Sequence, residues 1–171
     1  MSGGIELRLM TPKDLDAAIT LETRCYSPEA AATLSGFQYR LQHYGQFFWS
    51  AWSGGELVGI TNGIRTSQSS CGDEMKGHQP DAESGGNFCV LTVAVLPGYR
   101  RRGIGSLLLR KLILHCEAAG VERMILMCEK HLIRFYEAEG FIWHGLSSSA
   151  HGGIEWHEMS RELHTMEHLT E

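Results

Sequence analysis

Hydrophobic and polar residues alternate through residues 5–10, and this period of two predicts a first β-strand. Thr11 followed by Pro12 predicts a helix start, with Thr11 as the N-cap and Pro12 at the first helical position. A second helix is predicted over residues 28–44. The apolar side of the first helix consists of Leu15, Ile19 and Leu21.

Aromatic and β-branched residues at 47–52 and 56–60 flank Ser53-Gly54-Gly55, a pattern that predicts a β-hairpin. The apolar run at residues 88–95 predicts a strand that is buried on both faces. Residues 103–119 carry apolar side chains at helical spacing, with Gly120 where a helix ends.

The remaining elements complete a sequence of strands and helices. Residues 123–128 predict a buried strand, and residues 131–139 a short helix that Gly140 ends. Two closing strands are predicted at residues 141–144 and 154–160. The order βααβββαβαββ indicates an α/β fold around one sheet of mixed direction. The polar segment at residues 66–86 predicts a long loop, which in a compact domain usually serves function.

The composition is that of a single globular domain, and we take residues 1–171 as one. Hydrophobic residues make up 43% of the chain and charged residues 20%. The net charge of -5 provides no overall attraction to nucleic acid or to an anionic membrane. No apolar run reaches the length of a membrane span, and no secretory signal is evident. We therefore expect a cytoplasmic protein with neither kind of partner.

Five cysteines form an odd set without a CxxC pair, which favours thiols in a reducing compartment over a disulfide framework. These are Cys25, Cys71, Cys89, Cys116 and Cys128. Nine histidines raise the question of a metal site. His157-Glu158 begins like an HExxH zinc helix, but the second histidine position holds Arg161, so we expect no metal.

The segment Arg100-Arg101-Arg102-Gly103-Ile104-Gly105-Ser106 lies between the buried strand and an amphipathic helix. The first-turn amides of a helix lack internal partners and carry partial positive charge, so they can hold an anion. Glycine allows a pyrophosphate to approach the backbone closely. The spacing fits neither a Walker A loop nor GxGxxG, and a solvated basic loop without a ligand is the alternative.

Several segments resemble the GNAT superfamily of N-acetyltransferases. LTVAVLPGYRRRGIGSLLL is similar to its acetyl-CoA motif, [Q/R]xxGx[G/A], through Arg100, Gly103 and Gly105. LMCEKHLIRFYEAEGF resembles the next motif, and RLMTPKDLDAAITLE and GELVGI extend the similarity over nearly the whole chain. Within the superfamily, the arylalkylamine (serotonin) N-acetyltransferases and their non-animal relatives are most similar. The resemblance implies a mixed, mostly antiparallel sheet flanked by helices.

The resemblance also implies the roles of the site residues, with acetyl-CoA as co-substrate. The backbone of Val93, Ala94 and Val95 would pair with the pantetheine arm. Tyr136 would border the cofactor sulfur and protonate the departing thiolate as a general acid; the alternative is a core aromatic. The pyrophosphate would be held at Arg100, Arg101, Arg102, Gly103, Ile104, Gly105 and Ser106.

The general base is not evident. An amine with a pKa of about 10 is only about a thousandth neutral at pH 7, so its proton must be removed. Cys89 and Leu91 stand where the arylalkylamine enzymes carry two histidines. Glu22, His78, Glu83 or a water chain could substitute. An acetyl-Cys89 intermediate is a further alternative, although buried cysteines are usually inert.

The function predicted is direct acetyl transfer, through a ternary complex, to a primary amine such as an arylalkylamine or a di- or polyamine. Acidic residues of the long loop could attract such a cation. These are Asp73, Glu74, Asp81 and Glu83. The alternatives are acetylation of a protein N-terminus or lysine, and a non-catalytic acyl-CoA-binding module.

Overall fold

A computed structural model describes residues 4–71, 85–149 and 151–163, and within them one mixed sheet organises the chain. Its seven strands lie in the order β1-β2-β3-β4-β5-β7-β6, and every neighbouring pair is antiparallel except β4 with β5. The strands are β1 (Glu6–Leu9), β2 (Trp49–Ser53), β3 (Glu56–Thr66), β4 (Asn87–Val95), β5 (Arg123–Cys128), β6 (Ile142–Leu146) and β7 (His157–Glu162).

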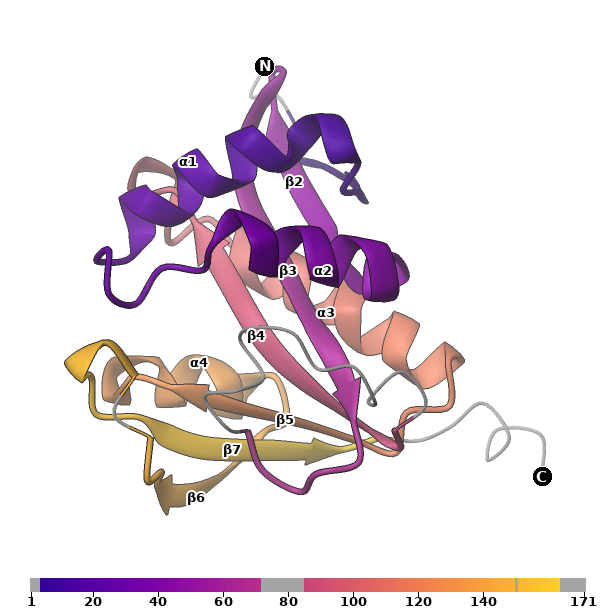
Figure 1. Ribbon diagram of the computed structural model, residues 1–171, viewed down its shortest axis with the longest axis vertical. Helices are drawn as coiled ribbons and strands as arrows, with labels where there is room; N and C mark the ends of the chain where they lie inside the picture. The colour runs from indigo at the N-terminus through magenta and orange to yellow at the C-terminus, as the bar shows by residue number, and fades with distance from the viewer. Residues whose placement is uncertain (1–3, 72–84, 150, 164–171) are drawn as a thin grey trace.

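Four helices flank this sheet, and together with the strands they confirm the predicted order and fold class. The helices α1 (Leu15–Cys25) and α2 (Leu34–Tyr44) cover one face, and α3 (Ile104–Ala118) covers the other (Figure 1). The short helix α4 (Ile133–Ala138) connects β5 to β6. No helix among the described residues is both long and apolar enough to cross a membrane.

The first helical segment starts at Pro12 with Thr11 as its N-cap, as the sequence predicts, but its first turn is 3-10 and α1 begins only at Leu15. Pro12 opens a 3-10 turn, where the backbone N–H and the hydroxyl of Thr11 donate to the Asp14 carboxylate at 3.3 and 2.7 Å. The second helix begins at Leu34 rather than at residue 28. Its N-cap is Thr33, whose hydroxyl oxygen accepts from the Gly36 amide at 3.1 Å and so fixes the start of the helix.

Helix α3 connects two hydrophobic clusters, one on each side of the sheet's centre. Its first turns place Ile104 and Leu108 against β2 and β3, in the cluster that α1 completes from the other face. Its later turns place Leu109 and Leu112 among those of β4, β5 and β7. All four side chains are at most 1% exposed, so α3 fixes the two halves of the sheet against each other.

A β-bulge interrupts the pairing of β3 with β4. Asn62 pairs with Thr92 and Gly63 with Val90, which leaves Leu91 as the extra residue. A side chain at Gly63 would collide with the Cys89 carbonyl oxygen and the Phe88 ring, so only glycine fits there. A bulge increases the local twist, and β4 bends at this point.

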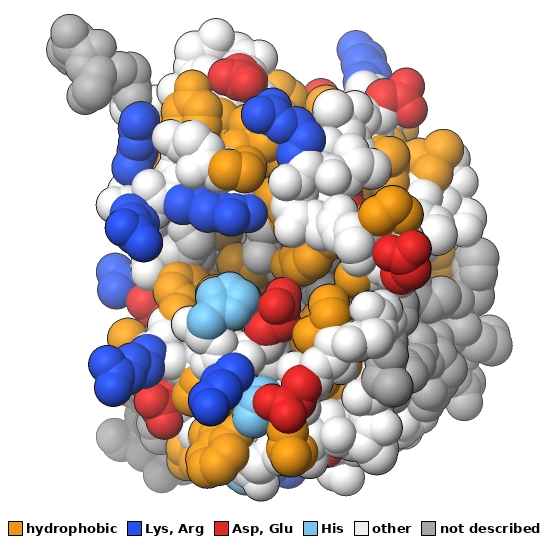
Figure 2. Space-filling view, turned by 90° about the vertical axis from the view of Figure 1, so that its left-hand side faces the viewer, with side chains coloured by type: hydrophobic (Ala, Val, Ile, Leu, Met, Phe, Trp, Pro, Cys, Tyr) orange, Lys and Arg blue, Asp and Glu red, His pale blue; other side chains and the backbone are white. Residues whose placement is uncertain are grey.

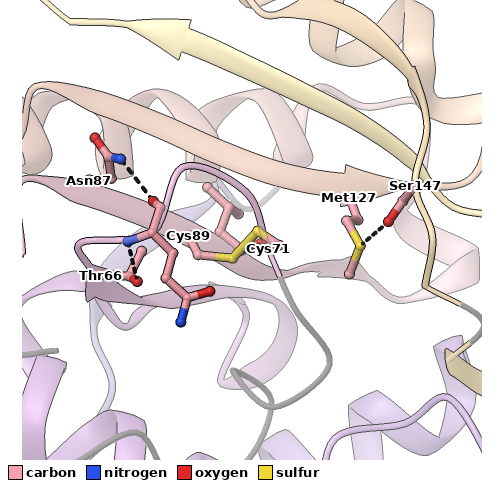
Figure 3. The surroundings of a disulfide bond; sticks show 8 residues. Thr66, Cys71, Asn87, Cys89, Met127 and Ser147 are labelled. Atoms are coloured by element: carbon pink, nitrogen blue, oxygen red, sulfur yellow. Dashed lines mark hydrogen bonds between the residues drawn. A yellow bond between two sulfur atoms is a disulfide. The ribbon is translucent and has the colours of Figure 1, made fainter. Parts of the chain in front are cut away.

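A disulfide joins Cys71 to Cys89, and the prediction that all five cysteines are thiols is wrong for these two. Their Cα atoms lie 6.3 Å apart, within the range that a disulfide can bridge. The segment between β3 and Cys71 is anchored where the Gln68 amide donates to the Thr66 hydroxyl, at 3.0 Å, and Asn87 Nδ2 donates to the Gln68 carbonyl, at 2.9 Å (Figure 3). Because two of the five cysteines form a disulfide, the cysteine content no longer supports a reducing compartment.

Reduction of this disulfide should destabilise the fold. Cross-linking residues 18 apart restricts the unfolded chain, so the Cys71→Ser variant should lose about 3 kcal/mol in free energy of unfolding. Urea denaturation with and without a phosphine reductant measures this loss. Cys71→Ser should no longer respond to the reductant, and equal stability of the oxidised and reduced wild-type protein would contradict the expectation.

Candidate active site

The functional cleft opens where β4 and β5 separate. Their parallel pairing runs only from Asn87 with Arg123 to Val90 with Leu126, and β4 continues to Val95 without a β5 partner (Figure 1). The prediction that this strand is buried on both faces therefore holds only for its first half. Beyond the bulge, its cleft-facing positions are half-buried, and its backbone borders open space.

The backbone of Val93 and Val95 faces this cleft. The Leu96 amide donates to the Val58 carbonyl at 2.9 Å, and hydrogen-bonded positions alternate along an antiparallel pair. Ala94, opposite Ile60, therefore directs its backbone groups to β3, while those of Val93 and Val95 point the other way. Ala94 borders the cleft, but its amide and carbonyl belong to the sheet.

The loop after β4 ends at the N-terminus of α3, as the sequence predicts. Gly103 caps the helix at φ 80°, a left-handed conformation that favours glycine. The first helical hydrogen bond runs from the Leu107 amide to the Gly103 carbonyl, at 3.0 Å. The amides of residues 104–106 thus precede the first bonded turn, and all three residues border the cleft. The result is a positively polarised rim without a charged side chain of its own.

The three arginines of the loop have different positions. Arg100 Nε donates to the Val95 carbonyl at 3.0 Å and so ties the loop to the end of β4. Arg101 borders the cleft, and its backbone has the left-handed conformation, with φ of 64°. Arg102 lies over the Tyr99 ring, 5.1 Å from its centroid, and does not line the cleft. Figure 2 faces this side and shows Lys and Arg side chains along one margin of a hollow with an apolar floor.

The cleft has a volume of about 650 Å³ and includes nearly every residue predicted to bind the cofactor. Arg102 is the exception. The predicted residues that line it are Val93, Ala94, Val95, Arg100, Arg101, Gly103, Ile104, Gly105, Ser106 and Tyr136.

A second, smaller cavity of about 270 Å³ lies on the other side of the β4 backbone, against the segment between α1 and α2. Leu91, the bulged residue, lines it, and so do Met127 and Trp156. The residues common to both cavities are Tyr26, Val93, Glu129, Leu132 and Tyr136. These five residues therefore lie at the junction where the two cavities adjoin.

Two polar residues at this junction, Tyr26 and Glu129, were not identified from the sequence, nor was the apolar Leu132. Tyr26 directly follows α1, and its hydroxyl lies 3.5 Å from the Val93 carbonyl oxygen. No spacing or motif marks it. Glu129 stands in the LMCE stretch that supports the family resemblance, so a signal was present, although it gave the residue no role.

Tyr136 is buried, with its ring edge-to-face against Phe135 at 4.9 Å and Phe141 at 5.7 Å. Burial raises the pKa of its phenol well above the usual value, and the neighbouring Tyr26 and Cys128 raise it further. Burial likewise raises the pKa of Tyr26, with Glu22 as the next cause. Both phenols therefore keep their protons at neutral pH and are hydrogen-bond donors.

Of the base candidates, Glu22 lies in the wall of the smaller cavity. Its Oε2 accepts from the Ala32 amide at 2.8 Å. The buried Arg40 donates to Asn62 Oδ1 at 2.9 Å and to the Thr92 hydroxyl at 3.3 Å. Burial lowers the pKa of Arg40 to about 10, while the charge of Glu22 opposes that shift.

Within the described part of the chain, none of the remaining candidate residues from the sequence is available as a base. His78 and Glu83 lie outside the described residues, as do Asp73, Glu74 and Asp81. Cys89 carries no free thiol, since it forms the disulfide with Cys71. Among the residues that the structure describes, no group of three or more His, Cys, Asp or Glu side chains is placed to hold a metal ion.

Solved structures with this fold include two that hold a CoA compound. The loading GNATL domain of CurA from Lyngbya majuscula has a TM-score of 0.80 and 18% identity, covering 93% of this chain and 98% of that domain. The GphF GNAT-like decarboxylase in complex with isobutyryl-CoA has a TM-score of 0.77 and 21% identity, covering 93% and 100%. Arabidopsis thaliana Naa50, in complex with the bisubstrate analogue CoA-Ac-MVNAL, has a TM-score of 0.72 and 18% identity, covering 93% and 99%.

These identities show a shared fold, and no curated protein matches the sequence. The acetyltransferase (GNAT) family matches residues 15–141, which include α1, the cleft and Tyr136. The chain therefore belongs to the acetyltransferase (GNAT) family, and the predicted acetyltransferase activity and acetyl-CoA co-substrate are confirmed with it.

Proposed function

We propose that the protein transfers acetyl from acetyl-CoA directly to the primary amine of a small molecule bound in the smaller cavity. The observation that carries this proposal is the junction, where the 650 Å³ cleft and the 270 Å³ cavity meet beside Val93 and Tyr136. Two substrates entering from opposite sides would bring their reacting groups together there. The proposal takes residues 1–171 as one catalytic domain, since strands from both ends of the chain share one sheet.

The cofactor would lie along the larger cleft, with its pyrophosphate at the N-terminus of α3 and its thioester at the junction. Its pyrophosphate would accept hydrogen bonds from the amides of residues 104–106, with Arg101 adding charge. Its pantetheine amides would pair with the backbone of Val93 and Val95, extending β4 on its open side. The thioester would then reach the junction, where the Val93 amide can stabilise the developing oxyanion.

The reaction needs a proton for the leaving thiolate, and Tyr136 would supply it. Its phenol borders both cavities and stays protonated at neutral pH because burial raises its pKa. The attacking nitrogen forms a bond to the carbonyl carbon, the carbon–sulfur bond breaks, and the phenolic proton goes to sulfur. The phenolate then recovers a proton from the substrate nitrogen or from water.

The lining of the smaller cavity supports a small cation with an apolar body as the acceptor. Leu91, Met127 and Trp156 provide apolar and aromatic surface. Glu22 and Glu129 provide negative charge, and the buried Arg40 in the same wall offsets that of Glu22, which leaves Glu129 in excess. An arylalkylamine, the acceptor implied by the sequence resemblance, has both features, whereas a di- or polyamine has only the charge. A cavity of this size suits a small molecule.

A peptide N-terminus is the second candidate acceptor. Naa50, whose structure holds a CoA-Ac-MVNAL analogue, shares the fold along nearly its whole length. An amine panel with thiol release as readout separates the candidates. It would contain an arylalkylamine, a diamine and a short peptide, and faster turnover of the peptide would contradict the small-amine proposal.

Gly105→Val should weaken coenzyme A binding. A Cβ there would lie 3.4 Å from the Phe135 ring and 3.9 Å from Val95 Cγ2, so the valine methyl groups would occupy the cleft. We expect about a tenfold or greater loss of affinity by calorimetry, with unchanged circular dichroism. Gly98→Ala is the matched control, because a Cβ there meets no atom within 4 Å and Gly98 does not line the cleft. Unchanged affinity in folded Gly105→Val would refute this placement of the cofactor.

Tyr136→Phe should slow the chemical step while leaving coenzyme A affinity unchanged, since the ring remains packed. General acids commonly contribute about 10²–10⁴-fold, and we expect the low end because a thiol leaves readily. Single-turnover kinetics avoid masking by product release. Tyr39→Phe, a buried tyrosine that lines neither cavity, is the control. Equal single-turnover rates for Tyr136→Phe and wild type would make Tyr136 a packing residue only.

Kinetics should be sequential, with no acetyl group on Cys89. The sulfur of Cys89 is bonded to Cys71 and is no nucleophile in that state. Mass spectrometry after incubation with acetyl-CoA alone should show no adduct that amine then removes. Such an adduct would establish the covalent route instead.

A further inference from the structure

The junction of the two cavities contains one side chain, a carboxylate, that can accept a proton at neutral pH. An ammonium ion must lose a proton before its nitrogen can attack, and the attack takes place where both substrates are in reach. Of the five residues there, Val93 contributes backbone and Leu132 is apolar. Tyr26 and Tyr136 are phenols that keep their protons, because burial raises both pKa values. Glu129 alone has a carboxylate.

The backbone holds Glu129 firmly at this place. It follows the last residue of β5, and its carbonyl accepts from the Leu132 amide at 3.0 Å, which begins the turn into α4. Its charge is among the causes that raise the pKa of Tyr26 and of the Cys128 thiol, so the carboxylate lies near both groups. Its side chain is 33% exposed, so water also reaches it.

His131 lies beside this carboxylate, on the side of the cofactor cleft. Its Nδ1 lies 3.9 Å from Glu129 Oε1, and its side chain is 70% exposed. It borders the cofactor cleft and not the smaller cavity, so it lies beyond Glu129 as seen from the acceptor. A proton on Glu129 therefore has a titratable neighbour in contact with bulk water.

Glu22 is placed less well for the same task. It lines the smaller cavity but not the cofactor cleft, so it faces the acceptor and not the thioester, although its charge also acts on Tyr26. Its carboxylate accepts from the Ala32 amide and faces the positive charge of Arg40. These contacts suit a group that shapes the acceptor cavity.

We propose that Glu129 is the general base of the reaction and that His131 passes its proton to solvent. This inference rests on the proposed acetyl transfer to an amine. The ammonium gives one proton to the Glu129 carboxylate, and the freed lone pair attacks the thioester carbon. As the carbon–sulfur bond breaks, Tyr136 protonates sulfur and regains the second nitrogen proton. The first proton leaves through His131, so the products are the amide, coenzyme A and one proton in water.

The decisive variant is Glu129→Gln, which keeps the shape of the side chain and removes its charge. Two acceptors of the same skeleton are compared in single-turnover reactions: an arylalkylamine and its β,β-difluorinated analogue, at an assay pH where the first is protonated and the second is neutral. The variant should be slowed about 10²-fold or more with the arylalkylamine. With the fluorinated amine, the ratio of variant to wild-type rates should stay within about threefold, since no proton need be removed before attack.

The controls separate this role from packing and from binding. Glu137→Gln removes an exposed carboxylate of α4 that lines neither cavity, and it should match wild type with both amines. Coenzyme A affinity of Glu129→Gln should be unchanged. Added formate should restore part of the arylalkylamine rate in Glu129→Ala, which leaves room for it, and His131→Asn should slow the arylalkylamine by a smaller factor.

Two results overturn the inference. One refutes only the role of Glu129, and the other refutes the proposed function as well. Equal losses with both amines, or no loss with either, would show that Glu129 does not act as the base while acetyl transfer itself stands. If the wild-type protein binds acetyl-CoA but acetylates neither amine, the proposed function fails and the role of Glu129 fails with it.

Discussion

The separation of β4 from β5 after four paired residues is the constraint on which the rest of the structure depends. It exposes the backbone of Val93 and Val95 and creates two cavities that meet at the same point. The bulge at Leu91 bends β4 there, and the absence of a side chain at Gly63 lets β3 follow. Helix α3 holds the separated halves together, since it packs into both hydrophobic clusters.

Charge is distributed unequally between the two cavities, although the protein as a whole is acidic. The cofactor cleft has the polarised amides of α3 together with Arg100 and Arg101. The smaller cavity has Glu22 in its wall and Glu129 at its entrance, with the buried Arg40 hydrogen-bonded to Asn62 and Thr92. An anionic cofactor and a cationic amine would thus meet opposite local fields, which a net charge of -5 conceals.

Burial sets the chemistry of the groups at the junction. It raises the pKa of Tyr26 and Tyr136, so both remain neutral donors, and it raises the pKa of the Cys128 thiol to about 12, so that group stays inert. Glu129, with a side chain 33% exposed, is reached by solvent and has a histidine beside it. The proposed division between acid and base follows from this difference in environment, since proton donors are buried and the acceptor borders water.

The sequence by itself determined the order of elements, the hairpin and the strand–loop–helix segment from Phe88 to Leu112, because these depend on periodicity and caps within a few residues. The predicted start of α2 at residue 28 is wrong, because the helix begins after the N-cap Thr33. The tertiary structure alone decided the Cys71–Cys89 disulfide, the place of Tyr26 beside Val93, and the outward turn of Arg102. Such contacts depend on sheet register and on how far β4 bends, and these are fixed by packing between segments distant in the chain.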